Sequence, residues 1–343
     1  MTGKSKSEES QPPENIIVAA DHGRLDLVTA LLEGGADPNT VNDIGTSALH
    51  NAANNGHWDI VRLLLEKNAS PGIEDGNCAT PLRLAVRAGH KEIVRLLLEC
   101  DPPTSETKKL EAHRFLRIAA SLGHTEIVQL FLDCDTPTLS SKEQETALQL
   151  AAFKGHHDIC DLLLKHDKAL DRSLWTRMVG PKLEVDTKDY AGNTPFAYAV
   201  EKGHKQTVEV FLRNYPELRE TCDKWKTPHF HAAIKRGSIE MVQIFLDHGT
   251  DVEMKGDQGY RALHVAVKTD SLGFVTGTTE MLHLLLAHGA AVDAVDEYGS
   301  KPEFYTKNPK IRMLLRNHSA THSKSDQLPK APIASAPPPE YKA

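Results

Sequence analysis

The stretch that decides the fold is residues 80–99, TPLRLAVRAGHKEIVRLLLE. Thr80 and Pro81 open a helix, because a threonine side chain can cap free N–H groups and proline fits the first helical turn. Gly89 ends this helix, since the chain must turn left-handed there and glycine does so without a steric penalty. After His90, a second apolar stripe follows at helical period. The stretch therefore predicts two short helices joined by a tight turn.

The same unit recurs along most of the chain. Glycines equivalent to Gly89 stand at positions 23, 56, 123, 155, 203 and 237, in steps of 32 to 34 residues apart from one step of 48. In the worked unit, Leu82, Leu84 and Ala85 are expected to supply the buried side of the first helix. One such pair of helices cannot enclose its own apolar face, so neighbouring pairs must stack. The repeats predict an all-α solenoid.

The pattern resembles the ankyrin repeat, whose form is Thr-Pro-Leu-His-x-Ala-x-x-x-Gly-His followed by a Leu-rich helix. Residues 48–57, 81–90 and 147–156 are the clearest matches. The resemblance implies about eight helix-turn-helix units plus a degenerate C-terminal capping unit. The expected boundaries are a disordered tail at 1–13, an ankyrin-repeat domain at 14–318 with units near 16–47, 48–80, 81–113, 114–145, 146–191, 192–225, 226–258, 259–297 and 298–318, and a Pro-rich disordered tail at 319–343.

Composition limits the classes of partner and compartment. Forty basic and 47 acidic residues give a net charge of −7, which argues against direct nucleic-acid binding. No apolar stretch approaches the ~18 residues of a membrane span, and the N-terminus does not read as a secretory segment. The five cysteines have no close pairs, which is typical of a reducing compartment. The chain is expected to be intracellular, in the cytoplasm, the nucleus or both, and not secreted.

No residue pattern indicates chemistry. Most of the 18 histidines fill repeat positions, where an imidazole can bond to loop backbone, and His156-His157 and the His229/His231 pair have no Cys or carboxylate at ligand spacing. Phosphate-binding loops and nucleophile motifs are absent from the sequence. We therefore expect no catalytic, cofactor-binding or metal-binding residues, no cofactor and no enzyme activity.

The candidate functional residues are partner-binding ones. In the family, partners are gripped by the finger loops and by the two residues before the helix-ending glycine. Carried onto this sequence, these positions include Phe153, Lys154, Lys202, Lys235 and Arg236 before the glycines, and Tyr190, Trp225, Tyr260 and Tyr298 in the fingers. Aromatic and Arg side chains of this kind dominate interface energy. The alternative is that these aromatics only cover loop backbone.

Two further sequence features add partner hypotheses. Trp175 lies in the inserted stretch near 168–184, where it either anchors a partner or holds the loop down. In the tail, Pro338, Pro339 and Tyr341 match the Pro-Pro-x-Tyr pattern of WW-domain ligands, although a Pro-rich tail can give this match by chance.

The function expected from these features is a non-enzymatic protein–protein interaction scaffold. We expect a regulatory adaptor, such as a transcriptional coregulator acting through a partner protein. The alternative is a WW-domain-binding adaptor that recruits substrates to a ubiquitin ligase. The partners would be one or more proteins, a transcription regulator or a WW-domain protein among them.

Overall fold

In a computed structural model, the chain folds as helices joined by short turns, without a β-strand in the part described. The structure describes residues 15–101, 106–133, 141–169, 185, 188–223, 227–271 and 277–325. Two compact units divide the chain, Met1–Asn214 and Tyr215–Ala343, which we call unit 1 and unit 2. This division falls inside the predicted repeat at 192–225. The two predicted tails lie almost wholly outside the described residues.

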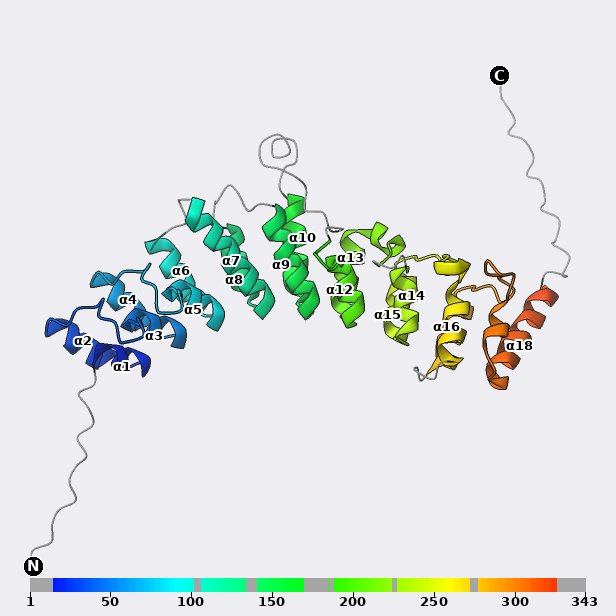
Figure 1. Cartoon of the computed structure of the whole chain (residues 1–343), viewed down its shortest axis with the longest axis horizontal. Helices are drawn as coiled ribbons and strands as arrows, with labels where there is room; N and C mark the ends of the chain where they lie inside the picture. Colours follow the sequence, from blue (N-terminus) through cyan, green and yellow to red (C-terminus); the bar gives the residue numbers. More distant parts are fainter. Residues whose placement is uncertain are drawn as a thin grey trace, which may run out of the picture. The chain divides into compact units, whose positions relative to one another are not determined.

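Unit 1 is a stack of helix pairs in chain order (Figure 1). Its first helices pack on one another in one layer and its second helices in another. The pairs are α1 (Ile16–Asp21) with α2 (Leu25–Glu33), α3 (Ala48–Asn55) with α4 (Trp58–Glu66), α5 (Pro81–Ala88) with α6 (Lys91–Cys100), α7 (Glu106–Leu122) with α8 (Thr125–Asp133), α9 (Ser141–Lys154) with α10 (His157–Ala169), and α12 (Pro195–Lys202) with α13 (Lys205–Asn214).

Unit 2 repeats this arrangement and ends in an incomplete repeat. Its elements are η1 (Pro216–Glu220), α14 (His229–Lys235), α15 (Ile239–Asp247), η2 (Asp257–Gly259), α16 (Ala262–Ser271), α17 (Thr278–Ala287), η3 (Pro302–Tyr305) and α18 (Pro309–Ser325). Helix α16 packs between α14 and η3, and α15 packs on α17. The eight helix pairs and the final η3/α18 element confirm the predicted all-α architecture.

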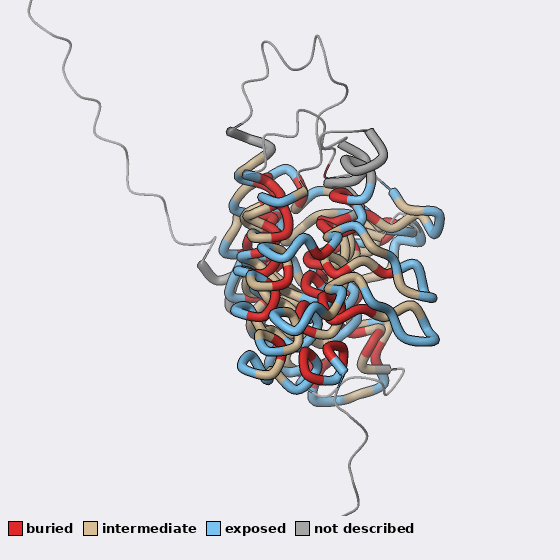
Figure 2. The backbone as a smooth tube through the Cα atoms, turned by 90° about the vertical axis from the view of Figure 1, so that its left-hand side faces the viewer, coloured by how far each residue is buried: buried red, intermediate tan, exposed pale blue. Residues whose placement is uncertain are grey.

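The stretch at residues 80–99 folds as its sequence predicts, with one difference. The Thr80 hydroxyl accepts a hydrogen bond from the Arg83 N–H at 3.2 Å, and Gly89 has φ +85°. Ala85 and Val86 are fully buried on α5, whereas Leu82 and Leu84 are only half-buried. A first helix packs against its own second helix and against the first helices of the neighbouring repeats. Its most buried face therefore includes Val86 and not Leu82 or Leu84. Figure 2 shows buried residues following the packed helices and exposed ones in the turns.

The recurring Gly-His pair links each repeat to the one before it. The Nε2–H of His90 donates to the Asn54 carbonyl at 3.0 Å, and its ring lies so close to Gly56 that a Cβ there would be 2.6 Å from Cε1. The same link is made by His57 on Gly23, His124 on Gly89, His156 on Gly123 and His204 on Gly155. Glycine is therefore needed at each such turn for two reasons: the backbone is left-handed, and the neighbouring imidazole leaves no room for a Cβ.

Two of the loops between repeats contain helix. Helix α7 begins at Glu106 and α9 at Ser141, several residues before the predicted units near 114–145 and 146–191 begin. Residues 106–112 contain no Gly or Pro and are mostly good helix formers, so the first helix extends backwards. Throughout the described chain, no helix combines the length and the apolar character that a membrane crossing needs.

Candidate partner-binding surfaces

The structure brings some of the predicted binding residues together and leaves others apart. Lys235 and Tyr260 line one cavity in unit 2. Phe153, Lys154 and Lys202 meet on unit 1. The remaining described ones, Tyr190, Arg236 and Tyr298, point to solvent. Trp225, Trp175 and the tail residues Pro338, Pro339 and Tyr341 lie outside the described residues.

The cavity of unit 2 lies between α14, α16 and the finger turn around η2, and we call it the unit 2 cavity. It encloses about 460 Å³. Its described lining residues come from these three segments and are mostly polar or aromatic: Thr227, His231, Lys235, Asp257, Gln258, Tyr260, Val265, Lys268 and Thr269. The volume falls within the ~300–1,000 Å³ that is typical of ligand sites. The cavity can hold a large side chain of a partner.

One wall of the unit 2 cavity is formed by a tyrosine ring and a lysine ammonium group. The Lys268 ammonium lies 4.4 Å from the centre of the Tyr260 ring and donates to its hydroxyl at 3.1 Å. Tyr305 packs edge-on against Tyr260 with 5.5 Å between ring centres. The Tyr305 hydroxyl donates a short hydrogen bond to Asp296, and this bond raises the pKa of Tyr305. Lys268 and Tyr305 both contact Tyr260, so its ring is held in one orientation and is a rigid contact surface for a partner.

A buried histidine also lines the unit 2 cavity. His231 is 1% exposed, and no described residue forms a hydrogen bond with its Nε2. Burial lowers the pKa of His231 to about 4, and the nearby Lys235 charge acts in the same direction. A hydrogen bond from the ring to the Met254 carbonyl opposes this shift only in part, so the ring is neutral at pH 7. A buried polar atom without a partner costs free energy. A ligand in the cavity could supply the missing hydrogen bond.

The repeat position of His231 differs from the regular one in the groups that surround its ring. The isolated bridge Cys222–Pro228 corresponds to Val41–Ser47, so Pro228 stands where Ser47 caps α3. In that regular repeat the Ser47 N–H donates to His50 Nδ1 at 3.2 Å, and His50 Nε2–H donates to the Ala79 carbonyl at 2.9 Å. Pro228 has no N–H to donate.

The finger loop that follows α15, around η2, also departs from the regular pattern. Other fingers use an Asp or Asn side chain to hold the turn, as Asp75 does by accepting from the Asn77 and Ala79 N–H groups. The finger of the unit 2 cavity has Gly256 there, and a Cβ on it would lie 2.5 Å from His231 Nδ1. Gln258 in this finger adopts φ +57°, which is uncommon for a residue other than glycine. Such strain is often found at binding sites.

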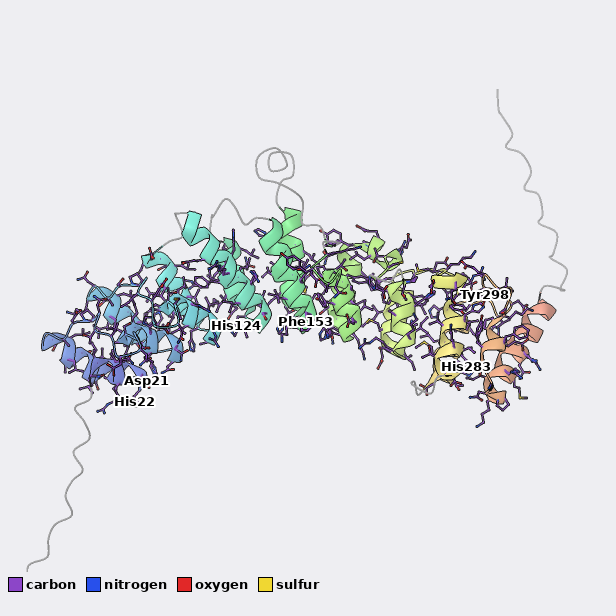
Figure 3. All side chains as sticks on the ribbon, in the orientation of Figure 1. Asp21, His22, His124, Phe153, His283 and Tyr298 are labelled. Atoms are coloured by element: carbon purple, nitrogen blue, oxygen red, sulfur yellow. The ribbon has the colours of Figure 1, made fainter. Side chains whose placement is uncertain are left out.

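The predicted residues of unit 1 form a smaller cluster across α9 and α12. Phe153 packs edge-on against Tyr198 with 5.3 Å between ring centres. The ammonium groups of Lys202 and Lys154 lie 4.7 Å and 5.7 Å from the Phe153 ring centre. Figure 3 shows Phe153 at the end of α9 that leads to α10. Two exposed lysines over one ring offer an anion a contact point.

Three predicted residues have no packed surroundings. Tyr190 is fully exposed at a finger tip, and Tyr298 is 69% exposed at another, visible in Figure 3. Arg236 is exposed after α14. Because Tyr190 belongs to unit 1 and Tyr260 and Tyr298 to unit 2, a single face shared by the finger aromatics stays a prediction.

Sequence reasoning missed His231 and Lys268, which line the unit 2 cavity, and Tyr305, which packs against Tyr260. For His231, the proline three residues before it was the available signal. Tyr305 follows Lys301-Pro302, which takes the place of Thr-Pro in the last repeat. This alignment predicts a first-helix position for Tyr305, next to the preceding first helix.

The chain resembles known proteins along most of its length. A family model described as "Ankyrin repeats (3 copies)" matches residues 16–108, 116–222 and 212–296. A Caenorhabditis elegans homolog of transient receptor potential cation channel subfamily A member 1 is 27% identical over 176 residues, 46% of this chain and 14% of that protein. Human BCL-6 corepressor-like protein 1 is 27% identical over 128 residues, 37% of this chain and 7% of that protein.

A solved structure, the human ASB11 ankyrin repeat domain, has 20% sequence identity and a TM-score of 0.36, covering 81% of this chain and 99% of that domain. The chain spans only a small part, 14% and 7%, of the two curated relatives. The family model, in contrast, matches well over half of the chain. The chain therefore belongs to the ankyrin-repeat family.

Proposed function

We propose that this ankyrin-repeat chain is a non-enzymatic regulatory adaptor that acts by holding a protein partner in the unit 2 cavity. The observation that carries the proposal is the joint presence there of a fixed tyrosine, two lysines and an unsatisfied imidazole nitrogen. Rigid aromatic rings surrounded by polar groups are typical of the residues that dominate binding energy.

The chemistry of the cavity suggests the type of group that enters it. Val265 and the Tyr260 ring provide apolar contact, and Lys235 and Lys268 provide positive charge. A partner side chain with an apolar body and a polar or negative end would satisfy both, and its polar end could pair with His231 Nε2. Aspartate and glutamate, or a hydroxyl-bearing ring, have this character.

A role as a transcriptional coregulator is the finer form of this proposal. Its support is the similarity of 37% of the chain to a protein named BCL-6 corepressor-like protein 1. The sequence contributes no DNA-binding module, so an effect on transcription would pass through the bound partner. The ankyrin scaffold itself carries many unrelated functions.

The test compares a cavity variant with a matched surface variant. Lys235→Glu with Tyr260→Ala removes the positive charge and the ring, whereas Phe304→Ala with Lys307→Glu makes similar changes at exposed positions outside the cavity. Partners captured by the wild-type full chain and identified by mass spectrometry would be titrated against all three proteins by calorimetry. We expect the cavity variant alone to weaken the affinity, by about tenfold or more, since hot-spot residues contribute ~2 kcal/mol. Equal affinity for both variants would refute the proposal.

A second function, recruitment of a WW-domain ubiquitin ligase, rests on the Pro338, Pro339 and Tyr341 motif. A peptide of residues 329–343 should bind an isolated WW domain with micromolar affinity, about −8 kcal/mol or weaker. Tyr341→Ala should abolish that binding, because the tyrosine ring fills a groove of the WW domain. If the wild-type peptide binds no member of a WW-domain panel, the recruitment function is excluded and the scaffold function remains.

A further inference from the structure

A second cavity lies on unit 1, and its lining is dominated by arginines. It encloses about 520 Å³ and extends over the first helices α5, α7 and α9. Arg83, Arg87, Arg114 and Arg117 line it, together with Leu122 and Leu150 among the apolar residues. No Asp or Glu is among the described residues that line it. We call this cavity the arginine groove.

Helical spacing and repeat stacking together place the four guanidinium groups. Arg83 and Arg87 are four residues apart on α5, and Arg114 and Arg117 are three apart on α7, so each pair shares one helix face. Helices α5 and α7 pack against each other, and α7 packs against α9. Two pairs on adjacent helices therefore converge on one surface. No single repeat of the sequence would reveal this convergence.

The arginine groove contrasts with the charge of the whole chain, which is −7. Like charges four residues apart destabilise a helix unless an anion is present. Arg83 is partly occupied, because it donates to the Cys78 carbonyl at 3.3 Å. Arg87 and Arg114 are exposed, and neither forms an ion pair with a described carboxylate. Both side chains are open to solvent.

Apolar side chains complete the arginine groove. Leu122 is 48% exposed at the end of α7, and Leu150 is half-buried on α9. Guanidinium groups bind carboxylates through two parallel hydrogen bonds, and exposed leucines favour an apolar contact. A ligand that matches this surface carries both acidic and apolar groups.

We propose that the arginine groove binds an extended acidic peptide segment of a protein partner, with its carboxylates on the arginines and an apolar side chain against Leu122 and Leu150. Neighbouring helices pack roughly 10 Å apart, so three of them span about 20 Å. An extended peptide rises ~3.3 Å per residue, and about six residues cover that length. The groove thus recognises a short linear segment.

Nucleic acid is the less favoured occupant. A phosphate backbone is a dense polyanion, and the acidic chain repels it beyond the local positive region. The described lining of the groove has no aromatic ring on which a base could stack. The leucines, in contrast, have a role only with a peptide.

The arginine groove goes beyond the proposed function, because it lies on unit 1 and shares no residue with the unit 2 cavity. Its test uses other variants, so either proposal can fail while the other stands.

The experiment selects ligands for the full chain from a display library of ten-residue peptides. The most enriched peptide is then labelled and titrated by fluorescence anisotropy. The groove variant is Arg87→Glu with Arg114→Glu. The control variant is Arg62→Glu with Arg95→Glu, which makes the same charge change at exposed arginines of unit 1 outside the groove. Melting curves verify that both variants fold.

We expect enriched peptides that combine acidic residues with a large apolar one. Their affinity should fall at least tenfold in the groove variant and less than threefold in the control. Arg87→Lys with Arg114→Lys should cause an intermediate loss, because charge is kept and paired hydrogen bonds are not. Leu122→Ser should weaken binding about threefold.

Three results would overturn the inference. In the first, the selection enriches no acidic peptides. In the second, the groove variant and the control variant lose the same affinity. The third is tighter binding of a twelve-nucleotide oligo-dT than of any peptide, lost in the groove variant, which would assign the surface to nucleic acid.

Discussion

His50 and His231 occupy the same position in their repeats, but their ring nitrogens have different hydrogen-bond partners. His50 Nδ1 accepts from the Ser47 N–H at the start of its own helix, and its Nε2–H donates to the Ala79 carbonyl before α5, so both ring nitrogens have partners. His231 has Pro228 in place of Ser47, and its Nε2 has no partner among the described residues. Pro228 removes the donor that a regular repeat offers to Nδ1, and His231 lines a cavity. Small departures from a repeat pattern are therefore the places to look for binding sites.

The largest expected effect breaks the regular stack itself. Leu97 is 1% exposed on α6, so Leu97→Asp buries a carboxylate without a partner and should cost about 3 kcal/mol or more. Circular dichroism melting measures the loss, with the exposed Arg95→Asp on the same helix as control. A melting curve equal to wild type would mean that Leu97 does not support the stack.

Acidification should destabilise unit 2 through its irregular repeat. Burial lowers the pKa values of His229 and His231 to about 4. The unfolded chain binds protons on these residues below pH ~6.5 but the folded chain does so only near pH 4, so stability is complete above pH 6.5 and falls between these values. The upper limit is about 3 kcal/mol for each histidine.

Urea unfolding at pH 7 and pH 4.5 tests this dependence. His231→Gln should lose part of the difference in the free energy of unfolding between the two pH values. His57→Gln serves as the comparison, because His57 is only half-buried on a regular turn. If His231→Gln keeps the whole pH dependence of the wild type, His231 is not its source.

A pair of glycine substitutions should separate the two reasons for glycine at the turns. Gly56 has φ +82° and the His90 ring against it, whereas Gly289 has φ +86° and no atom within 4 Å of the point that a Cβ would occupy. Gly56→Ala should cost about 2 kcal/mol and Gly289→Ala about 1 kcal/mol. Chemical denaturation measures both, and equal costs would show that the imidazole contact adds nothing.

The smallest effect on stability is expected from restoring the regular repeat. Pro228→Ser supplies an N–H and a capping hydroxyl, which stabilise, but it also frees the unfolded chain, which destabilises. The net change should stay within about 0.5 kcal/mol. The histidine NMR signals of His231 should nevertheless shift, because Nδ1 gains the donor that His50 has. Unchanged signals would show that the missing N–H of Pro228 does not set the surroundings of His231 Nδ1.

The sequence by itself determined the repeat, its helices and the turns between them. The reason is that these features depend on local rules: Thr80 caps, Pro81 starts a helix, Gly89 ends it, and apolar residues recur at helical period. Of the predicted binding residues, Lys235 and Tyr260 line the unit 2 cavity and Phe153 meets Lys154 and Lys202, because finger and pre-glycine positions are also fixed by the repeat.

Only the tertiary structure decided which positions meet across repeats. The contact of His90 with Gly56, the packing of Tyr305 on Tyr260 and the convergence of Arg87 with Arg114 each join residues from different repeats. Side-chain direction and helix spacing set these contacts, and a sequence period of about 33 residues does not encode them. The physical reason is that stacking creates surfaces that no single repeat possesses.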